Sequence, residues 1–223
     1  MTVRPRLAVA AVLAALGCAG CATEAPDYQS VWSTPSTTAT SAPASGADAV
    51  PIAAFLEQKG VVGQPVVPDK LTDLTVSMPT PRGWTPYRGT NLAPGARMIV
   101  KGDTYPSAML MVFELDGDFD AREAVTHGNV DAEMSENFTE LNSSATDFRG
   151  FPSSMIEGSY DLNGARMHTY NRIVIATGAP ERPGAAGQRY LIQFTVTGYA
   201  DKAAADAPDM ETIISGFTVQ VPK

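Results

Sequence analysis

The chain is 223 residues long, 44% of its residues are hydrophobic, and its formal net charge is −8. These values are typical of one globular domain with an additional segment, and the acidity disfavours binding to nucleic acid or, by charge alone, to an anionic membrane surface. From Cys21 onward, 14 basic side chains face 24 acidic ones, so the net charge of that part is about −10.

Residues 1–20 have the pattern of a bacterial lipoprotein signal peptide. Arg4 and Arg6 precede a short apolar run, Leu7–Leu16, and small residues follow it. This run is shorter than the stretch of about 20 residues that a membrane-spanning helix needs. We therefore expect the segment to be removed from the mature protein.

Both cysteines of the chain, Cys18 and Cys21, lie at the end of this segment. Ala19 and Gly20 are the small residues that a lipoprotein cleavage site places before its cysteine, so Cys21 is the predicted lipidation site. Cys18 is the alternative acceptor, and an ordinary secreted protein with an unused cysteine is the other alternative. Two acyl chains anchor a protein stably, since each buried CH₂ contributes about 0.8 kcal/mol. The anchor would hold the protein at the extracytoplasmic side of the cell membrane.

Residues 21–50 are predicted to be the lipidated cysteine followed by a disordered tether. The stretch is rich in Ser, Thr, Pro and Ala and contains too few large apolar residues to fold. It is expected to hold the domain away from the membrane. Its Ser/Thr-Pro sequences make O-glycosylation near residues 34–40 a hypothesis, with a bare flexible stalk as the alternative.

A folded domain is expected over residues 51–223. About 170 residues bury enough apolar surface to fold without disulfides, and no cysteine follows Cys21. A short helix is expected from Ile52, with Gly60 as its C-terminal cap. Strands are expected, in chain order, at Leu74–Met78, Arg97–Val100 and Ser107–Leu115. The last of these is apolar on both faces, as in a central strand that is covered from both sides.

A helix is expected next, beginning at Asp118 or Asp120 and continuing to about Asn137. The pair Gly128-Asn129 weakens its middle. The expected inner face of this helix consists of Ala121, Val125, Ala132 and Met134.

The second half of the domain has the pattern of a β-meander. Asn163-Gly164 is a strong type I′ hairpin signal between strands expected at Met155–Leu162 and Ala165–Ala176. The strand Gln188–Tyr199 alternates between apolar residues and a polar side made of Gln193, Thr195 and Thr197. A mobile Gly/Pro-rich loop is expected at 178–187, a helix at Pro208–Ser215 and a last strand at Phe217–Val221. This order predicts an α+β fold, a mostly antiparallel sheet with packed helices.

The residues of common catalytic and metal sites are sparse. His127 and His168 fall on different predicted elements, and the spacings of zinc sites, serine-hydrolase elbows and phosphate-binding loops are absent from the sequence. No metal ligand and no cofactor is therefore expected. His127 is expected to be exposed, and His168 to be a structural histidine in a strand. The acidic pairs Asp116/Asp118 and Glu133/Glu136 fit solvated caps and helix faces better than catalytic dyads.

The domain is rich in methionine, a residue that adapts to irregular apolar partners and is common at promiscuous binding surfaces. Met109 and Met111 lie on one face of the predicted central strand. They are the candidates for an apolar groove that binds acyl chains or a protein. The alternative is that the methionines fill gaps in the core.

Four stretches are specific enough to indicate a family: LTDLTVSMPTPRGW, YPSAMLMVFEL, NFTELNSSATDFRGFPSSMIEGSYDL and HTYNRIV. They cover most of residues 51–220, and PDYQS after Cys21 is similar to the start of a family member. The chain resembles the mycobacterial LpqN/LpqT lipoprotein family, with LpqT-like members as the nearest. The resemblance implies a PsbP-like α/β/α sandwich, a binding module rather than an enzyme, and lipidation at Cys21.

For LpqN-type members the resemblance implies glycolipid binding and association with transporters that export mycolate lipids. For LpqT-like members it implies interference with host Toll-like receptor signalling. The expected function is therefore a non-enzymatic envelope lipoprotein that binds a lipid, a glycolipid or an export transporter. The alternative is an interaction protein, acting on a partner or host receptor without a small-molecule pocket. An envelope hydrolase with an unfamiliar site is a third hypothesis.

Overall fold

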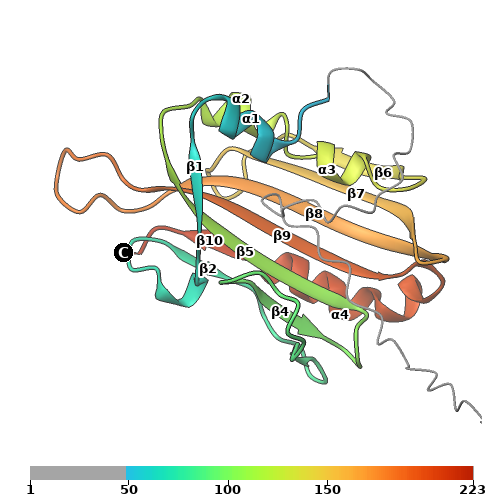
Figure 1. Cartoon of the computed structure of the whole chain (residues 1–223). Coiled ribbons are helices and arrows are strands. Elements are labelled where there is room, and N and C mark those ends of the chain that lie inside the picture. Colours follow the sequence, from blue (N-terminus) through green and yellow to red (C-terminus); the bar gives the residue numbers. More distant parts are fainter. Residues whose placement is uncertain (1–48, 223) are drawn as a thin grey trace, which may run out of the picture.

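The computed structural model describes residues 49–222 (Figure 1). The predicted signal peptide, Cys21 and nearly all of the predicted tether lie outside these residues, and each stays a prediction. Within residues 49–222, no helix is both long enough and apolar enough to cross a membrane.

A long, mostly antiparallel sheet forms the centre of the structure, with strand order β3-β4-β5-β9-β8-β7-β6 and β1 paired to β5. The strands are β1 Val62–Val66, β3 Thr85–Pro86, β4 Arg97–Val100, β5 Ser107–Asp116, β6 Thr139–Ser144, β7 Ser153–Leu162, β8 Ala165–Thr177 and β9 Arg189–Tyr199. A separate small sheet pairs β2, Thr75–Ser77, with β10, Thr218–Gln220. The predicted central strand is β5, which lies between β4 and β1 on one edge and β9 on the other.

Helices lie on both faces of the sheet (Figure 1). They are α1 Ile52–Gln58, α2 Ala121–Val125, α3 Val130–Glu133 and α4 Ala203–Gly216, with 3₁₀ turns η1 Pro68–Lys70 and η2 Ala200–Lys202. One core packs α4 and the β2–β10 pair against what we call the α4 face of the sheet. A second core packs α1 and α2 against the opposite side, the α1 face. The predicted α+β fold is confirmed.

The predicted hairpin between β7 and β8 is confirmed. Asn163 and Gly164 have φ values of 50° and 80°, the left-handed conformations that a type I′ turn requires. The ten cross-strand pairs from Ser153–Val174 to Leu162–Ala165 continue without a register shift.

The predicted helix from Asp118 or Asp120 to Asn137 is instead two short helices. Asp120 does cap α2, accepting hydrogen bonds from the backbone N–H groups of Arg122 and Glu123 at 2.7 and 3.0 Å. The helical conformation is interrupted around Gly128. This glycine lies so close to β7 and β8 that a Cβ atom there would collide with the Ser154 hydroxyl. The prediction that Met134 faces inward is wrong, because this side chain follows α3 and is 64% exposed.

Further elements, including the two-residue strand β3, differ from the sequence-based prediction. Strands β1 and β6 carry no clear alternation of buried and exposed residues, and they were not predicted. Helix α4 begins at Ala203 and contains Pro208 in its interior, so it extends before the predicted start. Its last residue is Gly216, one position beyond the predicted end at Ser215.

Candidate functional site

The side chains that β8 and β9 present to the α1 face change character along the strands. Near α1 and α2 these side chains are Ile173, Ile175 and Leu191, which we call the apolar half of the face. Toward the other end, and on the same side because side chains alternate along a strand, lies the polar half. It consists of Thr169, Asn171, Gln193, Thr195 and Thr197, of which all but Thr195 are buried.

The polar half is organised by cross-strand pairs. Asn171 is the register partner of Thr195, and the Thr195 hydroxyl donates to Asn171 Oδ1 at 2.8 Å. Thr169 is the partner of Thr197, and their hydroxyl oxygens lie 3.2 Å apart. These bonds offset part of the cost of burying the polar groups.

A small cavity of about 20 Å³ lies between the polar half and α3. This is enough space for a single water molecule. It is lined by Asp131, Ala132, Ser135, Tyr160, Thr169, Asn171, Gln193 and Thr195. Two buried oxygens of this lining, Asp131 Oδ2 and the Tyr160 hydroxyl, have no hydrogen-bond partner among the described residues. Burial raises the pKa of the Asp131 carboxyl to about 6.

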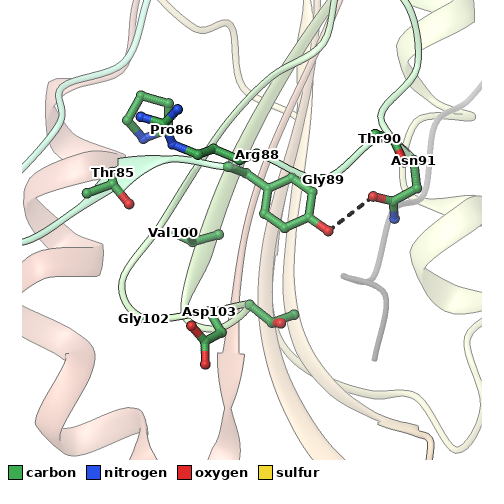
Figure 2. Close-up of a pocket in the computed structure, with 11 residues that line it drawn as sticks. Thr85, Pro86, Arg88, Gly89, Thr90, Asn91, Val100, Gly102 and Asp103 are labelled. Carbon is green, nitrogen blue, oxygen red and sulfur yellow. Dashed lines mark hydrogen bonds between the residues drawn. The ribbon is translucent and has the colours of Figure 1, made fainter. Parts of the chain in front are cut away.

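An open cleft of about 610 Å³ lies beside β3 (Figure 2). Its walls are Thr85, Pro86, Tyr87, Arg88, Gly89, Thr90, Asn91, Val100, Gly102, Asp103 and Thr104. The Tyr87 hydroxyl donates to Asn91 Oδ1 at 3.1 Å, which fixes the aromatic ring within the loop. Gly89 is needed here, because a Cβ atom would collide with the Tyr87 ring. The cleft therefore combines one aromatic and several aliphatic surfaces with hydroxyl, amide, guanidinium and carboxylate groups.

A third opening, of about 480 Å³, lies by the loop that joins β8 to β9. Three carboxylates line it, those of Asp73, Glu114 and Glu181, together with Arg182. Asp73 Oδ1 accepts a hydrogen bond from the Tyr190 hydroxyl at 2.9 Å. Burial, and then this hydrogen bond, raises the pKa of Tyr190. The excess of carboxylates makes this opening unfavourable for an anionic ligand.

Met109 and Met111 do not line an open groove in the described structure. They are 4% and 1% exposed and belong to the core that packs β5 against α1 and α2. Their apolar surface is already covered, so this position matches the alternative in which methionines fill gaps in the core. Cys21, the predicted lipidation site, lies outside the described residues.

Neither histidine lines the cavity or the cleft. His168 Nε2 is 3.0 Å from Glu157 Oε1 on the β7–β8 surface, as expected for a structural histidine. The prediction that His127 is exposed is wrong, because its ring stacks on Phe55 at 4.3 Å and its Nδ1 lies 2.8 Å from the Val50 carbonyl oxygen. The four carboxylates of the pairs Asp116/Asp118 and Glu133/Glu136 are exposed, as predicted. Within residues 49–222 no group of three His, Cys, Asp or Glu side chains is arranged to hold a metal ion.

Sequence reasoning missed the residues of the cavity and the cleft. Along β9, polar residues at 193, 195 and 197 alternate with apolar residues, a pattern that is common in strands with one side in water. The structure nevertheless buries Gln193 and Thr197. One signal was present: Leu191, on the same side of β9, is apolar, which is unusual for a strand face directed wholly to water. The loop that forms the cleft has no periodic pattern from which its shape follows.

Comparison with known proteins gives a consistent result. A family model described as "Probable lipoprotein LpqN" matches residues 48–220. The lipoprotein LpqT of Mycobacterium tuberculosis is 58% identical over 170 residues, covering 76% of this chain and 74% of that protein. The LpqT protein of Mycobacterium leprae is 49% identical over 170 residues, covering 76% of each. The crystal structure of LpqN, described as involved in cell envelope biogenesis of M. tuberculosis, has a similar fold, with a TM-score of 0.63. The two sequences are 19% identical, and the match covers 78% of this chain and 98% of LpqN.

Proposed function

The chain belongs to the LpqN lipoprotein family, and from this premise we propose that it is a non-enzymatic, membrane-anchored envelope lipoprotein that binds the head group of an envelope glycolipid. The observation that carries the proposal is the cleft beside β3, because its volume and its mixture of apolar and polar walls suit an amphiphile. Relatives that are named only as lipoproteins give no indication of an enzymatic activity.

The chemistry of the cleft suits a sugar better than a bare acyl chain. The Tyr87 ring offers an apolar surface for the C–H face of a sugar ring, while its hydroxyl is held by Asn91. Arg88 supplies donors and Asp103 supplies acceptors for hydroxyl groups, and both side chains are exposed in the cleft (Figure 2). A head group would bind here while its acyl chains remain in the membrane.

The experiment is a calorimetric titration of the mature chain, made soluble by Cys21→Ala, with n-decyl β-maltoside below its micelle concentration. We expect saturable binding, and at least a fivefold loss of affinity in Tyr87→Ala and Arg88→Ala. Arg182→Ala is the matched control, an exposed loop arginine of the third opening, and should bind as the parent does. n-Decyl phosphocholine, which has the same chain but no sugar, should bind more weakly. Absence of saturable maltoside binding would contradict the proposal.

The lipid anchor is tested separately in cells. We expect Cys21→Ala to abolish palmitate labelling and to release the protein from membranes, because two acyl chains supply the stable attachment. Cys18→Ala is the control and should leave both unchanged. Labelling that persists in Cys21→Ala and disappears in Cys18→Ala would move the anchor to Cys18.

Docking to a protein partner is a second candidate function. Met134, after α3, and Leu141, in the edge strand β6, are 64% and 62% exposed, which is unusual for large apolar side chains. An export transporter or a host receptor is the partner expected for this family. In-cell crosslinking through a photoreactive residue at position 141 would give a discrete adduct if β6 contacts a partner, and the same residue at exposed position 62 of β1 is the control.

A further inference from the structure

One half-buried arginine lacks the kind of partner that the others have. Between residues 49 and 222 the arginines of intermediate exposure are Arg97, Arg166, Arg172 and Arg189. Three of them form an ion pair with an aspartate, while Arg172 forms none with any carboxylate of this part of the chain. An arginine side chain is always charged in proteins, and removing that charge from water without a counter-ion is unfavourable. The charge of Arg172 is therefore uncompensated within residues 49–222.

The Arg172 guanidinium is nevertheless held in one orientation. Its Nε donates to the Tyr170 hydroxyl at 2.7 Å, and its Nη1 donates to the Ser153 hydroxyl at 2.9 Å. The Ser153 side chain is fully buried, and its hydroxyl donates in turn to the Thr146 carbonyl oxygen at 3.0 Å. Hydroxyl oxygens accept these bonds but do not neutralise the cation. The guanidinium is thus fixed in place, while its Nη2 donates to no atom of residues 49–222.

A second arginine lies against the same aromatic ring. The guanidinium carbons of Arg172 and Arg149 are 4.7 and 5.7 Å from the centre of the Phe148 ring. Arg149 is exposed at the tip of a two-residue turn that is closed by backbone hydrogen bonds of 2.9 and 3.0 Å between Phe148 and Phe151. It also forms no ion pair within the part of the chain that the structure describes. Two like charges beside one ring repel each other, so an anion that contacts both would be stabilised.

Carboxylates on the neighbouring elements are engaged with other cations. Asp147, two positions before Arg149, accepts hydrogen bonds from both Nη atoms of Arg122 at 3.0 and 2.9 Å. Glu157, on β7, lies 3.0 Å from His168 Nε2. The chain has 24 acidic residues against 16 Lys and Arg, yet none of the described ones neutralises this pair of arginines. The pair is therefore available to an anion from outside the chain.

Two guanidinium groups suit a phosphate group better than a carboxylate. A phosphate monoester carries about two negative charges at neutral pH and has three terminal oxygens, so it can accept from two guanidinium groups at once. A carboxylate carries one charge, and a single guanidinium fork satisfies both of its oxygens. The Tyr170 hydroxyl accepts from Arg172 and still has its own proton to donate to a further phosphate oxygen.

We propose that Arg149 and Arg172, beside the Phe148 ring, form a binding site for a terminal phosphate group. Tyr170 and Phe148 belong to the core on the α4 face, and no residue of the site lines the cleft beside β3. The inference is therefore independent of the proposed glycolipid binding. Arg172 is the fixed part of the site, and the exposed Arg149 contacts the phosphate from the turn. The same chemistry serves free phosphate and a phosphate at the end of a lipid, and the test separates these two sources.

The test is an amide NMR titration of the mature chain carrying Cys21→Ala, with inorganic phosphate and, separately, with dihexanoyl phosphatidic acid below its micelle concentration. We expect saturable shifts at residues 148–153 and 170–172 with both ligands, and none with sodium chloride at the same ionic strength. Equal affinities would identify the phosphate group alone as the ligand. At least fivefold tighter binding of phosphatidic acid would identify a phospholipid. Dihexanoyl phosphatidylcholine, which has the same chains but no terminal phosphate, should not bind.

Two variants test the arginines one at a time. Arg172→Gln removes the fixed cation and should weaken phosphate binding at least tenfold. Arg149→Asn should weaken it at least fivefold, and asparagine tolerates the left-handed φ of 54° at this position, so this variant remains informative if Arg172→Gln does not fold. Arg182→Ala, an exposed loop arginine of the third opening, is the matched control and should leave phosphate affinity unchanged.

Unchanged phosphate affinity in either folded variant would overturn the inference, and so would the absence of saturable shifts at these residues in the parent chain. Maltoside binding should be the same in Arg149→Asn as in the parent. A failure of the phosphate site would therefore leave the proposed function intact, and a failure of maltoside binding would leave the phosphate site intact.

Discussion

The two halves of the α1 face share strands, direction and depth, but they differ in chemistry. The apolar half packs Ile173, Ile175 and Leu191 into one hydrophobic cluster with α1 and α2. The polar half places amides and hydroxyls beneath α3, around a cavity with unpartnered oxygens. The covering helices differ accordingly, since α1 contributes four buried residues and α3 contributes two.

This difference changes how much each half of the face contributes to stability. The apolar half supplies free energy through the removal of about 25 cal/mol per Å² of apolar area from water. The polar half supplies less, because each buried polar group costs desolvation that its hydrogen bonds only partly offset. Truncations should therefore cost more stability in the apolar half than in the polar half.

The largest effect on stability is expected from Leu191→Ala in the apolar half. Leu191 is fully buried, and truncation of such a side chain costs about 2–5 kcal/mol through lost transfer free energy and the remaining cavity. Urea denaturation measures the change. Thr195→Val, four positions further along the same side of β9, is the matched control and should cost less, about 1–2 kcal/mol, because it removes the donor to Asn171 Oδ1. Equal losses in the two variants would remove the distinction between the halves.

A smaller loss is expected from Gly128→Ala at the boundary between the halves. The new Cβ atom would collide with the Ser154 hydroxyl and lie 3.0 Å from Ile173 Cβ, so the segment between α2 and α3 must shift away from the sheet. Overpacking of this kind costs about 1–3 kcal/mol. Gly150→Ala is a control for the loss of a glycine, because a Cβ atom there meets nothing within 4 Å, although its φ of 88° adds strain. A thermal melt of Gly128→Ala equal to that of the parent would contradict the close packing of α3.

Asp131→Asn should change how stability depends on pH. Because burial raises the pKa of Asp131 to about 6, the folded protein holds this proton more tightly than the unfolded chain does. The favourable contribution is complete below about pH 4 and is lost as the pH rises through 6. Asn cannot ionise, so relative to the parent the variant should gain about 2–3 kcal/mol between pH 4 and pH 8. Parallel stability curves for parent and variant would show that Asp131 is not buried in solution.

The smallest effect on stability is expected from Tyr160→Phe. The Tyr160 hydroxyl has no partner within residues 49–222, so its removal gives up no described hydrogen bond and should change the free energy of unfolding by less than about 1 kcal/mol. Tyr190→Phe is the contrast, because that hydroxyl donates to Asp73 and its loss should be destabilising. A Tyr160→Phe protein that is destabilised as much as Tyr190→Phe would contradict the absence of a protein partner for the Tyr160 hydroxyl.

The sequence predicted the parts of the fold that have strong local signals. The Asn163-Gly164 turn fixes the register of β7 and β8, and the doubly apolar pattern of β5 predicts a strand covered on both faces. The sequence indicates only that Gly128-Asn129 weakens the middle of the expected helix. The interruption itself results from contact with Ser154, which lies 26 positions later in the sequence and could not be inferred from the local pattern.

The candidate site was less predictable than the fold. Period-two alternation indicates which residues share a face, but it does not indicate whether water or another element covers that face. The alternation of β9 therefore predicts Gln193 and Thr197 only as part of a polar side, and it does not indicate that both are buried. For Met109 and Met111 composition alone suggested a groove, and only the packing of β5 against α1 and α2 shows that they are enclosed.

The most direct test of this account is an amide NMR titration of the mature chain carrying Cys21→Ala with n-decyl β-maltoside. The account predicts shifts at residues 85–91 and 102–104, which line the cleft beside β3. The amides of the apolar half should change little. Shifts confined to other surfaces, or no saturable shifts, would contradict the central claim that this cleft binds a glycolipid head group.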